Sequence, residues 1–363
     1  NKENQNVPLI SGETLKQFPI HKVDTFLNKQ SSSKVIFTSG GTTGEPKYSM
    51  YSNVEFSFIS KLLGESYLEL GLNESDVVAN LFVAGNMWSS FMAIYKALES
   101  TPATQLPIGG QCEIKDILKY LIDFKANTLF GIPSLLVELA HYCKAQKVNL
   151  EIEKIFYAGE KITDIQLKLF NSVWNMKSVY SAGYASVDVG PIGYQTKDCS
   201  LNEHYLFDGL DMEVIDGEAI VSSTIRKTMP VVRYKTGDKV KIISNSDKLK
   251  FRLIGRVDDM IYVWGSRISL GAIKTALYSS GLDHEESFQI ILSSSLNAVD
   301  NLEIVTKKLI SKDTFVKELF ILSEDIRNTV TKDYVLSHLV LKVSDTFLKV
   351  EKTGKTPQLL DLR

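Results

Sequence analysis

The chain carries the stretch Thr38-Ser39-Gly40-Gly41-Thr42-Thr43-Gly44-Glu45-Pro46-Lys47 directly after a strand-like apolar run that ends at Phe37. Glycines permit a tight turn with inward N–H groups, the hydroxyls add donors and the lysine adds charge, so this loop suits a polyphosphate. It is not a Walker A loop, because that motif needs Gly-Lys followed at once by Ser or Thr, whereas Tyr48 follows Lys47 here. Composition alone also allows a flexible hairpin rich in Ser, Gly and Thr.

Strand-like runs alternate with amphipathic segments through the first half of the chain. The expected strands are 34–37, 77–83, 128–131, 154–158 and 178–181, and the expected helices include 114–124, 133–146 and 164–173. This alternation predicts an α/β lobe whose mostly parallel sheets are flanked by helices, with sites at the carboxyl ends of the strands.

Short antiparallel-looking strands with turn signals follow, at 211–215, 219–222, 231–234, 239–243 and 250–254. They predict a small β-subdomain over about 205–257, which completes a large N-terminal lobe of residues 1–257. One β-turn-β-helix unit (260–278) then opens a small, mobile α+β C-terminal lobe of residues 258–363.

Composition excludes several classes of function. The 363 residues include 41 basic and 43 acidic side chains, and the net charge of −2 gives no general attraction to nucleic acid or to an anionic membrane. No apolar run reaches the ~18 residues of a membrane helix, and no signal peptide is expected at the start. Three widely spaced cysteines argue against a disulfide framework or a zinc knuckle, and Cys199 with His204 lacks a third metal ligand. We therefore expect a cytoplasmic protein.

Further motifs follow the loop in a particular order. They are Gly159-Glu160, Tyr184-Ala185-Ser186-Val187-Asp188, Tyr234-Lys235-Thr236-Gly237-Asp238, Gly255-Arg256-Val257-Asp258-Asp259, Gly265-Ser266-Arg267-Ile268, and Gly354-Lys355 with Asp361. This series resembles the adenylate-forming superfamily, which includes acyl-CoA and aryl-CoA synthetases, luciferases and the adenylation domains of peptide synthetases. The chain is most similar to the phenylacetate-CoA ligase branch, whose short members include the adenylating protein of phenazine antibiotic pathways.

The resemblance implies a role for each motif. Nucleotide binding falls to the loop (Thr38, Ser39, Gly40, Gly41, Thr42, Thr43, Gly44 and Lys47) and to Gly159, Glu160, Tyr184, Ser186, Asp238 and Arg256. The tyrosine would stack on adenine, and Asp238 would bind the ribose hydroxyls. Catalysis falls to Lys355, Asp188 and Arg267, with Asp188 also holding magnesium. Asp258 would be the hinge about which the C-terminal lobe swings.

Three residues depart from the family pattern in the same motif. Ala185 replaces a glycine, Val187 a hydroxyl residue and Asp188 a glutamate. The shorter carboxylate would hold magnesium through water, and Ser186 would substitute for the missing hydroxyl. These departures leave open a second hypothesis, a nucleotide-binding regulatory protein with lost or altered turnover.

An acid pocket is expected beside the nucleotide. Its predicted lining is Phe82, Gly85 and Trp88 on one side and Phe130, Gly131, Ala158 and Gly183 on the other. Aromatic and small side chains together favour a flat aromatic acid, with ordinary core packing as the alternative for each residue.

The implied reaction joins a carboxylic acid, favoured as aromatic, to ATP and yields acyl-AMP and pyrophosphate. Because two anions must meet, catalysis would be charge neutralisation and alignment, with Lys355 beside the incoming carboxylate. The acyl group would pass to CoA, to a carrier protein or to a partner enzyme of a biosynthetic pathway such as antibiotic synthesis. ATP, Mg²⁺ and CoA are the implied cofactors, and a homodimer is left open.

Overall fold

The computed structural model describes residues 7–23, 27, 33–38, 47–159, 162, 164–174, 176–257, 260–264, 266–294, 300–349 and 356–362. Contacts group the described residues into two compact units, a larger one up to Gly255 and a smaller one from Arg256 onward. None of the helices in the described ranges is long and apolar enough to cross a membrane.

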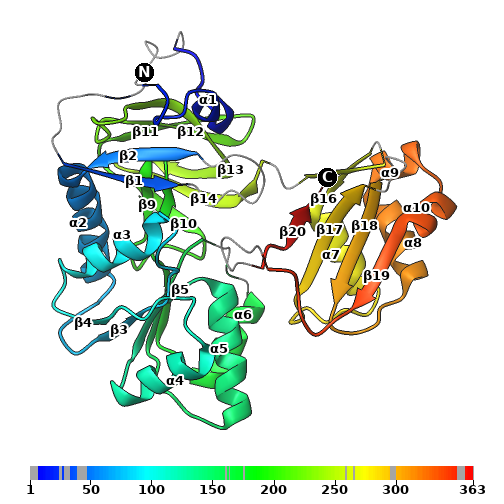
Figure 1. Ribbon diagram of the computed structural model, residues 1–363, viewed down its shortest axis with the longest axis horizontal. Coiled ribbons are helices and arrows are strands. Elements are labelled where there is room, and N and C mark those ends of the chain that lie inside the picture. The colour runs from blue at the N-terminus through cyan, green and yellow to red at the C-terminus, as the bar shows by residue number, and fades with distance from the viewer. Residues whose placement is uncertain are drawn as a thin grey trace. The chain divides into compact units, whose positions relative to one another are not determined.

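A five-stranded, fully parallel sheet forms one half of the larger unit. Its strand order is β4 (Thr104–Leu106), β3 (Val77–Asn80), β5 (Thr128–Gly131), β6 (Lys154–Tyr157) and β7 (Ser178–Ser181). Helices α4 (Ile114–Asp123), α5 (Pro133–Gln146) and α6 (Asp164–Trp174) cover one face, and α2 (Asn53–Glu69) and α3 (Ser89–Leu98) cover the other (Figure 1). This arrangement confirms the predicted α/β class.

A seven-stranded antiparallel sheet forms the other half. Its order is β11 (Leu210–Ile215), β12 (Glu218–Ser223), β13 (Val231–Asn245), β14 (Leu249–Arg256), β10 (Glu203–Leu206), β9 (Gly190–Tyr194) and β8 (Tyr184–Ser186). The sheet thus begins before residue 205, where the sequence pattern first indicated it. The two strands expected at 231–234 and 239–243 form one long strand, because a register shift between the Ile220–Lys235 and Glu218–Lys239 pairs accommodates the Thr236-Gly237 bend without a break.

The first strand belongs to neither sheet. β1 (Lys34–Thr38) pairs antiparallel with β2 (Tyr48–Ser52), and the short helix α1 (Gly12–Gln17) precedes them. α2 begins directly after β2, where the Ser52 hydroxyl accepts the Glu55 N–H and the Glu55 carboxylate accepts the Ser52 N–H. This capping box fixes the direction in which the chain leaves β2.

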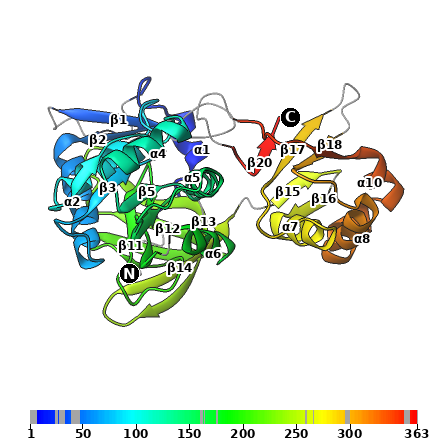
Figure 2. The same ribbon diagram turned by 90° about the horizontal axis from the view of Figure 1, so that it is seen from below.

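The smaller unit begins with the predicted β-turn-β-helix, formed by β15 (Met260–Val263), β16 (Ser266–Ser269) and α7 (Leu270–Ser279). A mixed sheet follows in the order β19 (Leu339–Val343), β18 (Asp300–Thr306), β17 (Phe288–Ser294) and β20 (Leu359–Asp361). Helices α8 (Lys312–Leu322), α9 (Glu324–Thr329) and α10 (Lys332–His338) lie between β18 and β19 in sequence, and α7 and α8 pack side by side (Figure 2). The unit therefore has the expected α+β composition and its own apolar core.

Candidate functional site

Three side chains that alternate along the chain at β2 converge on one segment. Alternate residues of an extended strand share a face, which places Lys47, Ser49 and Tyr51 together. Lys47 Nζ lies 2.6 Å from Asp188 Oδ2, Ser49 donates its hydroxyl to Asp188 Oδ1 at 2.7 Å, and Tyr51 donates to the Val187 carbonyl at 2.6 Å. The end of the predicted phosphate loop is thereby joined to the 187–188 segment.

Asp188 is almost wholly enclosed, with 1% of its surface exposed. Besides Lys47 and Ser49, the Tyr234 hydroxyl of β13 donates to Oδ2, and Lys47 Nζ donates to the same tyrosine oxygen at 2.8 Å. The Asp188 N–H donates to the Ser186 hydroxyl at 3.2 Å. A buried carboxylate needs such donors, because an isolated charge in this environment would be strongly unfavourable.

A second buried cation, Arg226, lies beside the same segment. Its Nε donates to the Asp188 carbonyl at 3.1 Å, and its guanidinium carbon lies 3.4 Å from the Tyr51 ring centroid. The side chain is 1% exposed, and within the described part of the chain Nη1 and Nη2 have no hydrogen-bond partner. The guanidinium therefore holds the main chain of Asp188, in addition to the donors that hold its carboxylate.

The loop that carries Arg226 is anchored by Glu55 at the start of α2. The Glu55 carboxylate accepts the N–H groups of Lys227 and Thr228, the latter at 2.7 Å. Burial alone would raise the pKa of Glu55, but hydrogen bonds from Thr228, Ser52 and Lys227 outweigh it and hold the pKa below its usual value. Two carboxylates and two cations therefore form one connected buried network.

Tyr184 and Asp238, two residues predicted to bind the nucleoside, meet in the structure. The Tyr184 hydroxyl donates to Asp238 Oδ2 at 2.9 Å, and the tyrosine ring packs edge-on against Phe251. The Asp238 N–H donates to the Thr236 hydroxyl, and Gly237 adopts a φ of 76° that favours glycine. The Thr-Gly-Asp bend of β13 thus presents its carboxylate to the tyrosine.

The other predicted nucleotide ligands lie at the ends of strands. Thr38 closes β1, where its hydroxyl donates to the Lys47 carbonyl at 3.1 Å, so the two ends of the loop are held together. Gly159 is exposed just after β6 with a φ of 81°, and Arg256 ends β14. Arg267 lies in β16, where its main chain pairs with Tyr262. Outside the described residues lie Ser39, Gly40, Gly41, Thr42, Thr43, Gly44, Glu160 and Lys355.

Comparison with known proteins places this arrangement in a wider context. An indoleacetate–lysine synthetase of Pseudomonas savastanoi is 24% identical over 244 residues, which are 66% of this chain and 62% of that protein. A phenylacetate-coenzyme A ligase of Pseudomonas putida is 24% identical over 257 residues, or 64% of this chain and 57% of the ligase. A solved 2-hydroxyisobutyryl-CoA ligase bound to 2-HIB-AMP matches 99% of this chain and 81% of its own with a TM-score of 0.72 at 16% identity. No family model matches the chain.

The chain is thus similar in sequence to adenylate-forming enzymes of the phenylacetate-CoA ligase-like branch, and similar in fold to a solved acyl-CoA ligase. The order of motifs, the sequence similarity and the fold agree on this relationship. The matches span less than two thirds of the length of these two sequence relatives.

The Asp188 carboxylate, to which the resemblance assigned magnesium, does not suit that ion in this structure. Mg²⁺ takes hard oxygen ligands at about 2.0–2.1 Å and keeps several waters, which needs space and free lone pairs. The Asp188 carboxylate is buried and already accepts three donors, one of them an ammonium. No group of three or more His, Cys, Asp or Glu side chains suited to a metal occurs among the described residues.

The predicted acid pocket is divided between core and surface. Phe82 is 3% exposed and Phe130 is fully buried, with its ring stacked 4.4 Å from Phe156. Gly131 is also buried, and Gly183 has a φ of 119° with a neighbouring Leu63 side chain that leaves no room for a Cβ. Gly85 is exposed. Trp88 is half-buried at the N-cap position of α3, and Ala158 is half-buried directly after β6. The two phenylalanines therefore act as core residues in this conformation, and the pocket lining stays a prediction.

The turn between β3 and α3 is the strained part of this region. Asn86 and Met87 follow Gly85 with φ values of 49° and 59°. Residues other than glycine rarely adopt this left-handed backbone conformation. The Gln111 amide holds the main chain of Ala84 at one end, and the Thr38 N–H donates to the Met87 carbonyl at the other. The turn is thus tied directly to the base of the predicted phosphate loop.

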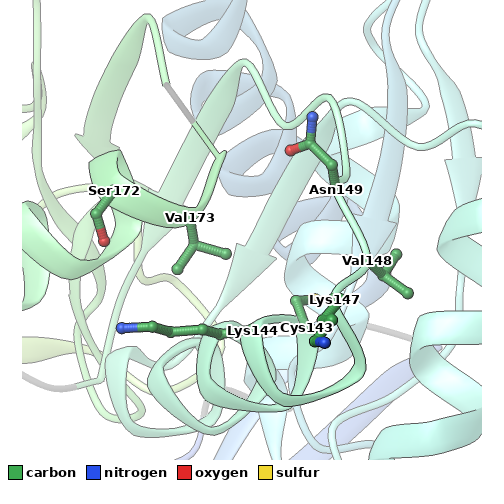
Figure 3. A pocket seen from close by; sticks show the side chains of 7 residues that line it. All are labelled: Cys143, Lys144, Lys147, Val148, Asn149, Ser172 and Val173. Atoms are coloured by element: carbon green, nitrogen blue, oxygen red, sulfur yellow. The ribbon is translucent and has the colours of Figure 1, made fainter.

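A shallow hollow elsewhere on the larger unit has no link to these residues. It lies where the C-terminal end of α5 meets α6, and its lining is Cys143, Lys144, Lys147, Val148, Asn149, Ser172 and Val173 (Figure 3). Burial raises the pKa of the Cys143 thiol, so this cysteine is not an activated nucleophile. The hollow is a surface feature between two helices.

No sequence motif marked Ser49, Tyr51, Glu55 and Arg226 as part of this network. The alternation of Lys47, Ser49 and Tyr51 is the signal that could have indicated a common face. Glu55 carries a capping-box signal three residues after Ser52, but its second role toward Lys227 and Thr228 depends on tertiary contacts.

His204 supplies a pH-dependent contribution to stability behind Tyr184. Its ring is 2% exposed and stacks on Phe251, and burial lowers its pKa from 6.5 to about 4. The unfolded chain therefore binds more protons between these values. The contribution of neutral His204 to the free energy of unfolding is fully present above pH 6.5 and is lost as the pH falls to about 4. The difference is about 3 kcal/mol.

We expect His204→Leu to flatten the pH dependence of the free energy of unfolding between pH 7 and 4.5, measured by urea denaturation. His284→Leu is the control, because His284 is exposed. Equal slopes for the His204 variant and the unmodified protein would show that this ring does not titrate as described.

Proposed function

We propose that this chain activates a carboxylic acid with ATP, forming acyl-AMP and pyrophosphate, and then transfers the acyl group to an acceptor. The observation that carries the proposal is that two pairs of motif residues meet, Tyr184 with Asp238 and Lys47 with Asp188. The family motifs assign the nucleoside to the first pair, the phosphates to Lys47 and magnesium to Asp188. Both pairs belong to the larger unit.

The chemistry needs positive charge and alignment rather than a nucleophile. A carboxylate oxygen attacks the α-phosphorus while pyrophosphate leaves, so the groups that help are those that neutralise anions and fix the reactants. Lys47 would approach the phosphates, Asp238 the ribose, and Arg256, Arg267 and Lys355 would contribute positive charge from the smaller unit. Magnesium, which ATP chemistry generally requires, would accompany the nucleotide.

The acid is proposed to be an aromatic one. Support comes from the names of the relatives, which act on indoleacetate and phenylacetate, and from a solved anthranilate-CoA ligase with anthranoyl-AMP that matches 88% of this chain with a TM-score of 0.58. The half-buried Trp88 at the start of α3 would suit such an acid. Arylacetates and aminobenzoates are therefore the first compounds to test.

Two classes of acceptor follow from the same comparisons. CoA is the acceptor named for the ligases, whereas the indoleacetate–lysine synthetase is named for an amino acid acceptor. We favour the CoA thiol, with a carrier-protein thiol or a lysine amine as the alternatives that the assay below distinguishes.

The test is acid-dependent exchange of labelled pyrophosphate into ATP over a panel of aromatic, arylacetic and fatty acids. We expect an aromatic acid to stimulate exchange above the acid-free background. Adding CoA, carrier protein or lysine separately to the productive acid then identifies the acceptor by mass spectrometry of the product. ATP binding measured by calorimetry without stimulation by any acid would instead favour the nucleotide-binding regulatory protein suggested by Ala185 and Val187.

A further inference from the structure

The carboxylate of Asp188 is occupied on both oxygens. Oδ2 accepts Lys47 Nζ at 2.6 Å and the Tyr234 hydroxyl, and Oδ1 accepts the Ser49 hydroxyl at 2.7 Å. With 1% of the residue exposed, no room exists beside it for the waters that a magnesium ion retains. An ammonium group at the same oxygen also repels a divalent cation.

The main chain of Asp188 is held as firmly as its side chain. Arg226 donates to the Asp188 carbonyl, and the Asp188 N–H donates to the Ser186 hydroxyl. Tyr51 donates to the carbonyl of the preceding residue, Val187. These contacts come from β2, β8 and the 223–231 connection, so turning the carboxylate toward solvent would break bonds to several elements.

The surroundings of Lys47 favour its ion pair with Asp188. It donates to Asp188 and Tyr234 on one side, and on the other its side chain lies against Gly12, where a Cβ would be 3.2 Å from Nζ. The side chain is 17% exposed, so the ammonium lies at the edge of the buried network. Asp188 thus controls the position of the lysine that ends the phosphate loop.

We propose that Asp188 is the counter-ion and positioning residue of Lys47, and that no metal ion binds its carboxylate. This inference rests on the proposed function, because it assigns Lys47 to the phosphates of ATP. It differs from the role that the family resemblance implied, in which Asp188 holds magnesium.

Kinetics of Asp188→Asn separate the two roles. If Asp188 positions Lys47, the KM for ATP rises by about tenfold, as expected for a weakened charged hydrogen bond to phosphate, while the half-saturating Mg²⁺ concentration stays within about twofold. Lys47→Met gives the same pattern, and the double variant adds little to either single change. A rise of about tenfold or more in the half-saturating Mg²⁺ concentration, confined to the Asp188 variant, overturns the proposal.

Asp76→Asn is the matched control. Asp76 is also 1% exposed and pairs with a lysine, Lys154, at 2.7 Å, but it lies at the start of β3 away from the predicted motifs. We expect this variant to lose stability without a change in the KM for ATP.

A manganese soak tests whether a metal ion binds Asp188, and it requires neither a variant nor turnover. Crystals of the unmodified chain are soaked with Mn²⁺ alone and with Mn²⁺ and ATP, and the ion is located by anomalous scattering. Manganese coordinated by Asp188 in either crystal overturns the proposal, whereas Lys47 still on Asp188 with no manganese there supports it. Absence of acid-dependent exchange would count against the proposed function and leave this structural result intact.

Discussion

Replacing Lys47 by methionine is expected to lower the free energy of unfolding by about 3–5 kcal/mol. Methionine keeps the length of the side chain but removes the ammonium that lies 2.6 Å from Asp188 Oδ2. The remaining carboxylate would stay buried, and among the described residues it would keep only the Ser49 and Tyr234 hydroxyls as side-chain donors. Two neutral hydrogen bonds do not compensate for an unpaired buried charge, which explains the size of the effect.

Urea denaturation of three variants tests this expectation. Lys119→Met is the control, because Lys119 pairs with Asp123 on the exposed face of α4 and should leave the unfolding midpoint unchanged. In Lys47→Met combined with Asp188→Asn the buried charge is gone, so part of the lost stability returns. A single Lys47 variant as stable as the Lys119 control would show that the folded state does not depend on the ion pair between Lys47 and Asp188.

The parallel sheet could be predicted from sequence because its strands are buried on both faces. Runs such as 129–131 and 155–158 are continuously apolar and stand out between amphipathic helices. The segment 48–52 has no such signature, since it reads Tyr-Ser-Met-Tyr-Ser and mixes small polar with large side chains. Its importance comes from Asp188, which lies 141 positions after Lys47, and only the fold brings the two together.

Arg226 shows a different limit of sequence analysis. Charged side chains are almost always exposed, so an arginine in the connection between two strands is ordinarily interpreted as a surface residue. Its burial follows from the Tyr51 ring, the Asp188 carbonyl and the Glu55 anchor, which come from three separate parts of the chain. By contrast, the motifs around Tyr184 and Asp238 marked both residues individually, although nothing in their order indicated that the two side chains would touch.

Replacing Lys355 by alanine is expected to reduce acid-dependent pyrophosphate exchange by at least about 10²–10³-fold, the effect typical of losing one preorganised charge-stabilising group. Lys355 lies outside the described residues, but both flanks of its segment are held in the smaller unit. The fully buried Gln289 of β17 donates its amide to the carbonyls of Leu348 and Pro357 at 2.8 and 3.0 Å, and it accepts the Leu348 N–H. One side chain therefore holds both described flanks of the segment, at Leu348 and at Pro357.

The same variant separates the two half-reactions. Because Lys355 is proposed to neutralise the incoming carboxylate, its loss should leave ATP affinity and acyl transfer from a supplied acyl-adenylate close to those of the unmodified chain. Lys349→Ala is the matched control, since this exposed lysine lies in the same connection and should retain exchange. Gln289→Ala should give a smaller loss of exchange, because it loosens the flanks but keeps the charge. If Lys355→Ala slowed both half-reactions equally, its effect would be structural and charge neutralisation would have to come from another cation.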